Sequence, residues 1–129
     1  MSNLSLCYSK VKNYEESIKI DLKIISIDPQ YDKSYARLFN NYLALDKKDQ
    51  ALYFGDMLLK FDDDTKNKYK ESDIITKIIE LKNEFQAQYD EKKAKERKAM
   101  IKSIAKYVIP ILVLGAAVAI YFFVFKKSK

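Results

Sequence analysis

Two basic side chains and an amide share one face of a predicted helix. In the stretch "DKSYARLFNNY" (32–42), Lys33 and Arg37 are four residues apart, and Asn40 follows three residues later. Like charges at this spacing repel by about 0.2–0.5 kcal/mol. An anion between them turns the repulsion into attraction, because a guanidinium, an ammonium and an amide together can satisfy carboxylates with charge-assisted hydrogen bonds. The spacing predicts a carboxylate-binding face; the competing interpretation is two ordinary surface charges.

Catalysis has no comparable support in the sequence. The chain has no histidine, one cysteine (Cys7) and two glycines, Gly55 and Gly115. It therefore lacks the commonest general base, a thiol–histidine pair and a glycine-rich phosphate loop. We expect no enzymatic activity, no metal and no cofactor. A single cysteine cannot form an internal disulfide, which suits a reducing cytosol.

An apolar segment near the C-terminus predicts a membrane span. Tyr107 to Phe125, "YVIPILVLGAAVAIYFFVF", is 19 residues without a charge. As a helix it is roughly 28 Å long, close to the roughly 30 Å hydrocarbon core of a bilayer. A core helix is the alternative, but about a hundred residues cannot enclose a helix that is apolar on every side. Only "KKSK" (126–129) follows, so we expect a tail anchor that inserts after translation.

Positive charge is concentrated around this span. Residues 1–90 hold 14 Lys or Arg against 16 Asp or Glu, whereas residues 91–106 hold 7 against 2. Cations near headgroups gain on the order of 1 kcal/mol each, and the larger basic group precedes the span, which predicts a cytosolic N-terminal domain. Nucleic-acid binding is not expected, because no aromatic residues are interleaved to stack on bases; a plain solvated helix is the other alternative. The expected membrane-surface residues are Lys92, Lys93, Lys95, Arg97, Lys98, Lys102 and Lys106, with Lys126, Lys127 and Lys129 beyond the span.

The first 65 residues repeat with a period of 34. The shift superposes Leu4 on Leu38 and Tyr8 on Tyr42, and this period is typical of helical hairpins. Apolar residues recur at helical spacing between the polar breaks "KVKN" and "LDKKD", and "SIDPQ" closes the first unit. We expect an all-α fold whose repeated leucines and tyrosines, with Cys7, form the core.

These positions resemble the tetratricopeptide repeat family. The first unit matches the family pattern at Leu4, Ser5, Tyr8, Tyr14, Ser17, Ile27 and Pro29. The second unit matches at Tyr35, Leu38, Tyr42, Ala51, Leu58 and Phe61, and departs at Phe39, Lys48 and Asp63. The resemblance implies two helical hairpins over residues 1–65, the first incomplete at its N-terminus.

The remaining segments are expected to form one long helix. No glycine or proline interrupts the chain from Lys66 to Ile109. An apolar stripe that includes Ile74, Ile78, Leu81 and Phe85 predicts a capping helix over 66–90, because a repeat stack needs a terminal helix with one polar face. A basic juxtamembrane helix (91–106), the span (107–125) and a short basic tail (126–129) follow.

The resemblance also implies a site. In chaperone adaptors of this family, including the membrane-anchored immunophilins, a carboxylate clamp on the first helix of each hairpin holds the C-termini of the seventy- and ninety-kilodalton heat-shock chaperones. Asn3, Lys33 and Arg37 match that clamp, and Asn40 lies in the same stripe. The clamp's other lysine and asparagine belong to a preceding repeat. A prolyl isomerase domain, as in longer immunophilins, is absent from this chain.

Two other functions stay open at this stage. A membrane scaffold similar to the mitochondrial fission adaptor would bind a partner by shape, and a small subunit of a membrane complex would pack through Gly115 to Ala119. The array also begins abruptly, with fewer than the roughly three repeats a stable stack needs, so we expect either an upstream repeat or a partner at that end.

The anchor prediction can be tested with residues 91–129 fused behind a fluorescent protein. We expect insertion after translation with the reporter accessible to protease on the cytosolic side, because the larger basic group stays there. We also expect the mitochondrial outer membrane rather than the endoplasmic reticulum. A protected reporter would refute the topology, whereas reticular fluorescence would refute only the organelle.

Overall fold

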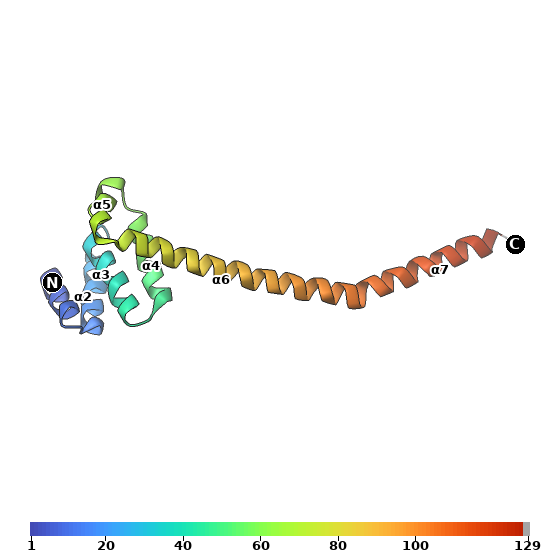
Figure 1. Cartoon of the computed structure of the whole chain (residues 1–129), viewed down its shortest axis with the longest axis horizontal. Helices are drawn as coiled ribbons and strands as arrows, with labels where there is room; N and C mark the ends of the chain where they lie inside the picture. The colour runs from blue at the N-terminus through green and yellow to red at the C-terminus, as the bar shows by residue number, and fades with distance from the viewer. Residues whose placement is uncertain (128–129) are drawn as a thin grey trace. The chain divides into compact units, whose positions relative to one another are not determined.

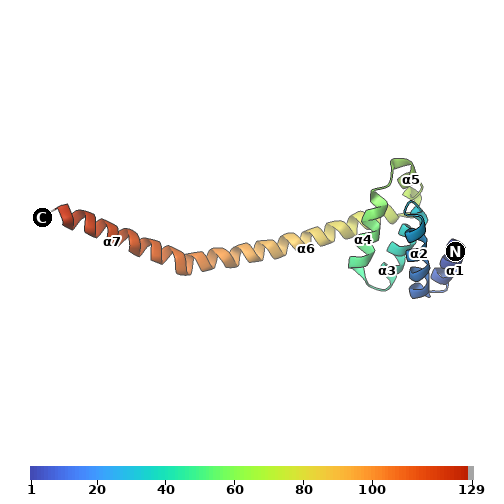
Figure 2. The ribbon, with the colours of Figure 1, turned by 180° about the vertical axis from the view of Figure 1, so that it is seen from behind.

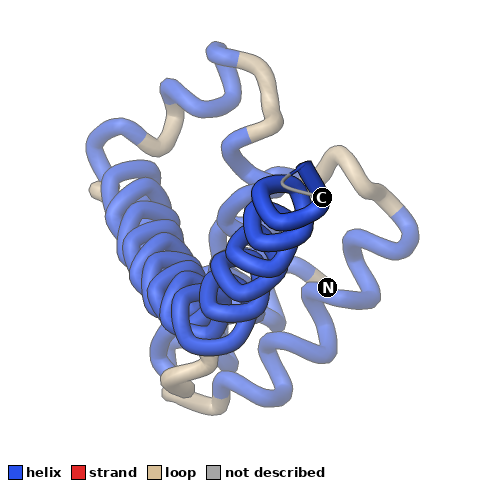
Figure 3. The backbone as a smooth tube through the Cα atoms, turned by 90° about the vertical axis from the view of Figure 1, so that its right-hand side faces the viewer, coloured by secondary structure: helices blue, strands red, loops and turns tan. Residues whose placement is uncertain are grey.

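Helices and short connections account for all of residues 1–127, the part of the chain that the computed structural model describes (Figures 1 and 3). No strand occurs in this range, so the all-α prediction is confirmed. Ser128 and Lys129, part of the expected basic tail, lie outside the described residues. The chain divides into two units, Met1–Phe85 and Gln86–Lys129, each of which is described separately below.

The N-terminal unit begins with four helices in two hairpins. They are α1 (Ser2–Lys10), α2 (Tyr14–Ile27), α3 (Asp32–Ala44) and α4 (Lys48–Leu59). Each packs against its neighbour in the chain, and α1 also contacts α3 (Figure 2). The breaks between helices fall at the polar segments that the sequence singles out.

Both hairpin turns have the same backbone geometry. Lys12 and Asp46, which are 34 positions apart, both adopt left-handed φ angles, 63° and 55°. The next amide in each turn bonds back five residues to a tyrosine carbonyl, Asn13 to Tyr8 and Lys47 to Tyr42, both at 2.9 Å. This is the hydrogen-bond pattern that closes helix C-termini, where glycine is the usual residue. The 34-residue period therefore extends to the backbone of the turns.

The core lies mainly in the second hairpin and the first part of α6 (Ile74–Ser103). Leu38 and Phe39 of α3, Leu58 of α4 and Ile78 of α6 are fully buried. The first hairpin adds little apolar material, and Leu4, expected in the core, is 53% exposed. Cys7 is exposed as well. The sequence predicted that the repeated leucines of both hairpins and Cys7 form the core. That prediction is wrong for α1, where Leu4 and Cys7 are exposed.

The helix expected from Lys66 onward begins at Ile74. Before it come a short helix α5 (Asp63–Asn67), a 3-10 turn η1 (Lys70–Ser72) and Asp73, whose φ of 56° is left-handed. Asp62 caps α5 by accepting a hydrogen bond from the Thr65 amide at 2.8 Å. Tyr69 donates its hydroxyl to Asp32 at the start of α3, and burial raises the pKa of Tyr69, as does this hydrogen bond. Polar caps and one tertiary bond therefore interrupt a segment without glycine or proline.

The C-terminal unit is helical throughout its described residues. The rest of α6 leads into a π-helical turn, η2 (Ile104–Val108), and then α7 (Ile109–Lys127). In the π turn the Ile109 amide bonds to the Ile104 carbonyl, five residues back. Pro110 follows directly and has no N–H for the carbonyl four residues before it, so a widened turn here relieves the ring clash. By length and composition, this helix can cross a membrane once.

Gly55 lets three helices approach closely. A Cβ atom there would lie 2.9 Å from Cδ2 of Phe39 and 3.0 Å from Cγ1 of Ile78, so α3, α4 and α6 meet at this position. We expect Gly55→Ala to lower the free energy of unfolding by about 1–3 kcal/mol through overpacking, measured by tyrosine near-ultraviolet circular dichroism during thermal denaturation. Gly115→Ala is the control, because no atom lies within 4 Å of its added Cβ. Equal melting temperatures for the two variants would contradict the prediction.

Candidate functional site

The predicted clamp residues occupy two helices, and they differ in accessibility. Lys33, Arg37 and Asn40 lie on α3, whereas Asn3 lies on α1. Lys33, Asn40 and Asn3 are exposed. Within residues 1–127, Lys33 has no ion-pair partner. An ammonium and two amides are therefore available to an incoming ligand.

Arg37 has a partner inside the domain. Its Nε lies 2.8 Å from Oδ2 of Asp21, and its Nη2 lies 3.0 Å from Oδ1 of the same carboxylate. The Asp21 side chain is fully buried and that of Arg37 is 10% exposed. This two-point contact joins α2 to α3 and compensates the arginine charge. Sequence reasoning assigned Arg37 to a ligand and did not foresee Asp21.

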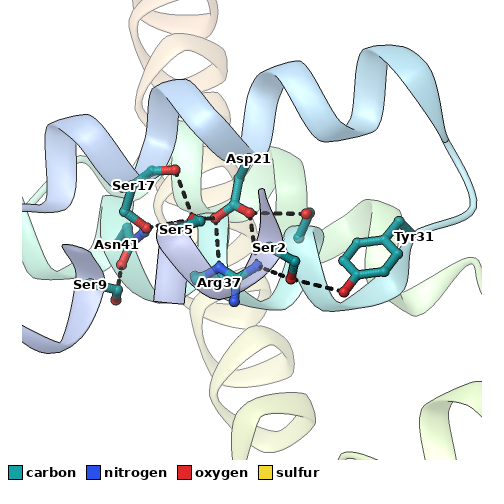
Figure 4. Close-up of polar contacts among 9 residues, drawn as sticks. Ser2, Ser5, Ser9, Ser17, Asp21, Tyr31, Arg37 and Asn41 are labelled. Carbon is teal, nitrogen blue, oxygen red and sulfur yellow. Dashed lines mark hydrogen bonds and ion pairs between the residues drawn. The ribbon is translucent and has the colours of Figure 1, made fainter. Parts of the chain in front are cut away.

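Asp21 is the centre of a larger polar seam, which we define by its hydrogen bonds as Ser2, Ser5, Ser9, Ser17, Asp21, Tyr31, Ser34, Arg37 and Asn41. Figure 4 shows these contacts, with all of the residues but Ser34 labelled. Ser5 donates to Oδ2 of Asp21 at 2.7 Å, and Ser34 donates to Oδ1 at 2.9 Å. With the two bonds from Arg37, the carboxylate accepts four hydrogen bonds, which is its full capacity.

The seam continues on both sides of Asp21. Toward one end, Arg37 donates to the Ser2 hydroxyl at 3.0 Å, and the Tyr31 hydroxyl donates to the same oxygen at 2.8 Å. Toward the other end, Asn41 donates to Ser17 at 2.8 Å and accepts from Ser9 at 2.7 Å. The seam therefore runs along the contact of α1 with α2 and α3.

Helical spacing explains why these residues meet. Ser2, Ser5 and Ser9 follow the spacing of one helix face on α1, and Ser34, Arg37 and Asn41 follow the same spacing on α3. Ser17 and Asp21 are one turn apart on α2. Every buried side-chain nitrogen and oxygen among the described residues has a hydrogen-bond partner. The signal in the sequence was this run of serines on the face of α1 that packs against the hairpin.

The seam leaves a defined set of donors for a ligand. Neither bond to Asp21 uses Nη1 of Arg37, and no contact in the described structure occupies that nitrogen. Because Asp21 compensates the arginine, the uncompensated charge on this face of α3 is that of Lys33. The arrangement can offer directional hydrogen bonds to a carboxylate, with one net positive charge.

The expected membrane-surface residues lie in the C-terminal unit and the end of α6. Lys92, Lys93, Lys95, Arg97, Lys98 and Lys102 are exposed on α6, and Lys106 is exposed in η2. Lys106 lies 5.2 Å from the ring centroid of Tyr107, the first residue of the predicted span. At about 1.5 Å per residue, Lys92 is roughly 22 Å along the helix from Tyr107, whereas Lys102 and Lys106 are within about 8 Å. A helix that continues straight out of a bilayer would bring only the last two to the headgroups.

No protein-family model, curated protein or solved structure matches the chain. Function is therefore assigned from the geometry of the site. The described residues also contain no group of three or more acidic or cysteine side chains that could hold a metal ion.

The seam predicts an unequal response of two acidic residues on α2. Asp21→Asn removes the charge that compensates buried Arg37, so we expect the free energy of unfolding to fall by about 3–5 kcal/mol. Glu16→Gln breaks an exposed pair with Lys19 (2.9 Å), which should cost less than about 1 kcal/mol. Hydrogen exchange of the full chain in detergent micelles should show faster exchange in α1 for Asp21→Asn only. Equal protection of α1 in both variants would contradict a stabilising role for the seam.

Proposed function

We propose that this protein is a membrane-anchored adaptor whose tetratricopeptide-like helical hairpins bind the acidic C-terminus of a protein partner at a cytosol-facing membrane. A heat-shock chaperone is the partner class that the clamp pattern favours. The observation that carries the proposal is the exposed ammonium of Lys33, which has no ion-pair partner within residues 1–127, on the same face of α3 as the exposed amide of Asn40. The 34-residue repeat of the two hairpin turns supports the family resemblance.

Arg37 acts in this proposal as a fixed hydrogen-bond donor. Asp21 holds two of its nitrogens, so the side chain loses little rotamer freedom when a ligand arrives. Its contribution to affinity is directional, because its charge is already compensated. Lys33 then supplies the charge that attracts the ligand's carboxylates.

The anchor in this proposal is the apolar helix α7. It follows an exposed basic helix, as expected for a domain held near anionic headgroups. The organelle in this proposal is mitochondrial, with the outer membrane as the surface on which the domain displays the α3 face that carries Lys33 and Asn40.

A scaffold that binds by shape is the second candidate function. The Asp21–Arg37 pair favours it, because a clamp arginine that is already charge-compensated binds an anion less strongly than a free one. In that version the same hairpins recognise a partner that needs no free C-terminal carboxylate.

A peptide and its amidated twin distinguish the two versions. We expect the full chain in lipid nanodiscs to bind a short peptide that ends in aspartate with a free carboxylate, and to bind the C-terminal amide much more weakly. Lys33→Ala should weaken binding by about 1.5–3 kcal/mol in calorimetry, as expected for lost charge-assisted hydrogen bonds. The matched control is Lys47→Ala, an exposed lysine beyond the end of α3. Equal affinity for the two peptides would refute the carboxylate site and favour the scaffold.

Arg37→Ala is predicted to weaken binding of the free-carboxylate peptide by a similar amount, but it also removes the ion pair at the centre of the seam. Its effect on binding is therefore interpreted only alongside its effect on unfolding.

A further inference from the structure

One side of α4 carries a partly exposed apolar stripe at the edge of the core. Tyr53 is 59% exposed on it, whereas Leu52 and Met57 are half-buried and pack partly against the core. A helix that faces water normally places polar residues on this side. Asp49 lies at one end of the stripe and Lys60 at the other.

Two adjoining depressions follow this stripe. The first, about 370 Å³, lies between α4 and the beginning of α6, where Leu52, Tyr53 and Phe85 form its apolar walls. The second, about 290 Å³, lies between the end of α4 and the α2–α3 connection, where Pro29, Tyr35 and Phe61 line it. Met57 and Lys60 line both. Together they form one groove along α4.

The walls of the groove are held in place by the fold. The ring of Tyr53 packs edge-on against that of buried Phe54, with ring centroids 5.0 Å apart. The rings of Phe61 and Tyr35 also pack together, with centroids 5.5 Å apart. An ion pair of 2.7 Å between Asp56 and Lys82 joins α4 to α6 at the rim. A groove with fixed aromatic walls loses little conformational entropy on binding, which is typical of protein-binding hot spots.

The charges at the two ends specify the occupant. Asp49 and Lys60 have no ion-pair partner within residues 1–127. Asp49 lies in the first turn of α4 and Lys60 is its C-cap, eleven positions later, which is about 16 Å along the helix axis. A partner helix that runs antiparallel to α4 meets Lys60 with its N-terminus and Asp49 with its C-terminus. Acidic residues near a helix N-terminus and basic residues near its C-terminus also suit the helix dipole.

We propose that this groove binds an amphipathic helix of a partner protein, antiparallel to α4. The helix inserts two bulky apolar side chains about one turn apart into the two depressions. It carries an acidic residue near its N-terminus, against Lys60, and a basic residue three turns later, against Asp49. This surface is separate from the exposed Lys33 and Asn40 of α3, so it stands whether or not the carboxylate site does.

The methionines provide a direct readout. The chain has three, and only Met57 lies in the groove; Met1 and Met100 are exposed elsewhere. The full chain, labelled with carbon-13 at the methionine methyl groups and reconstituted in nanodiscs, is titrated with a designed fourteen-residue helical peptide. Its second residue is glutamate, its sixth and ninth are leucine and its thirteenth is lysine. A twin peptide exchanges the glutamate and the lysine.

We expect the first peptide to shift the Met57 signal saturably and to leave Met1 and Met100 unchanged. Lys60→Glu should weaken binding of that peptide by about tenfold and improve binding of the charge-exchanged twin. Lys60 is exposed, so this variant should keep the fold, which far-ultraviolet circular dichroism checks. Tyr53 is exposed as well, and Tyr53→Ser should weaken binding of both peptides.

Three results would overturn the proposal. The first is no Met57 shift with either peptide. The second is equal binding of both peptides by the chain and by Lys60→Glu, which would mean an apolar surface without charge selection. The third is a Met57 shift that follows the protein concentration alone, which would identify a second copy of the chain as the occupant.

Discussion

The contact between the Asp21 carboxylate and the Arg37 guanidinium determines how the first hairpin is built. It lies where α1, α2 and α3 meet (Figure 4). Ser2, Ser5 and Ser34 bond directly to this pair, and the other members of the polar seam connect to it through further hydrogen bonds. Burying two charges costs several kcal/mol per ion unless their hydrogen-bonding capacity is filled. Here Ser5 and Ser34 complete the hydrogen bonds of the carboxylate, so the buried pair is tolerated.

In α1 the polar side chains face the other helices and leucines face solvent, which is the reverse of the usual amphipathic arrangement. α1 packs on its hairpin through serines, and it exposes Leu4 (53%) and Leu6 (41%). Hydrogen bonds are directional, so the seam fixes the position of α1 more narrowly than an apolar contact would. Apolar packing, by contrast, concentrates in the second hairpin, where Leu38, Phe39 and Leu58 are fully buried. The N-terminal unit thus has one hairpin specified by polar contacts and one specified by packing.

The two candidate surfaces inherit this division. The face of α3 with Lys33 and Asn40 depends on the seam, because Arg37 and Asn41 of the same helix form hydrogen bonds with α1 and α2. The groove along α4 depends on the core, because Phe54 and the close approach at Gly55 position its walls. A change in the seam should therefore disturb the first surface and spare the second.

The sequence by itself determined the all-α class, the hairpin boundaries and the apolar C-terminal helix, because these follow from local periodicity and from runs of like residues. It also marked Lys33 and Asn40, which remain on the surface. The partner of Arg37 was not predictable, since an arginine sixteen residues from an aspartate has no local signature until two helices pack. For the same reason Leu4 was expected in the core although it is exposed. The helix start at Ile74 also depended on tertiary contacts, because the Tyr69–Asp32 bond joins segments 37 residues apart. Helical period fixes which residues share a face, but only packing decides whether that face turns inward.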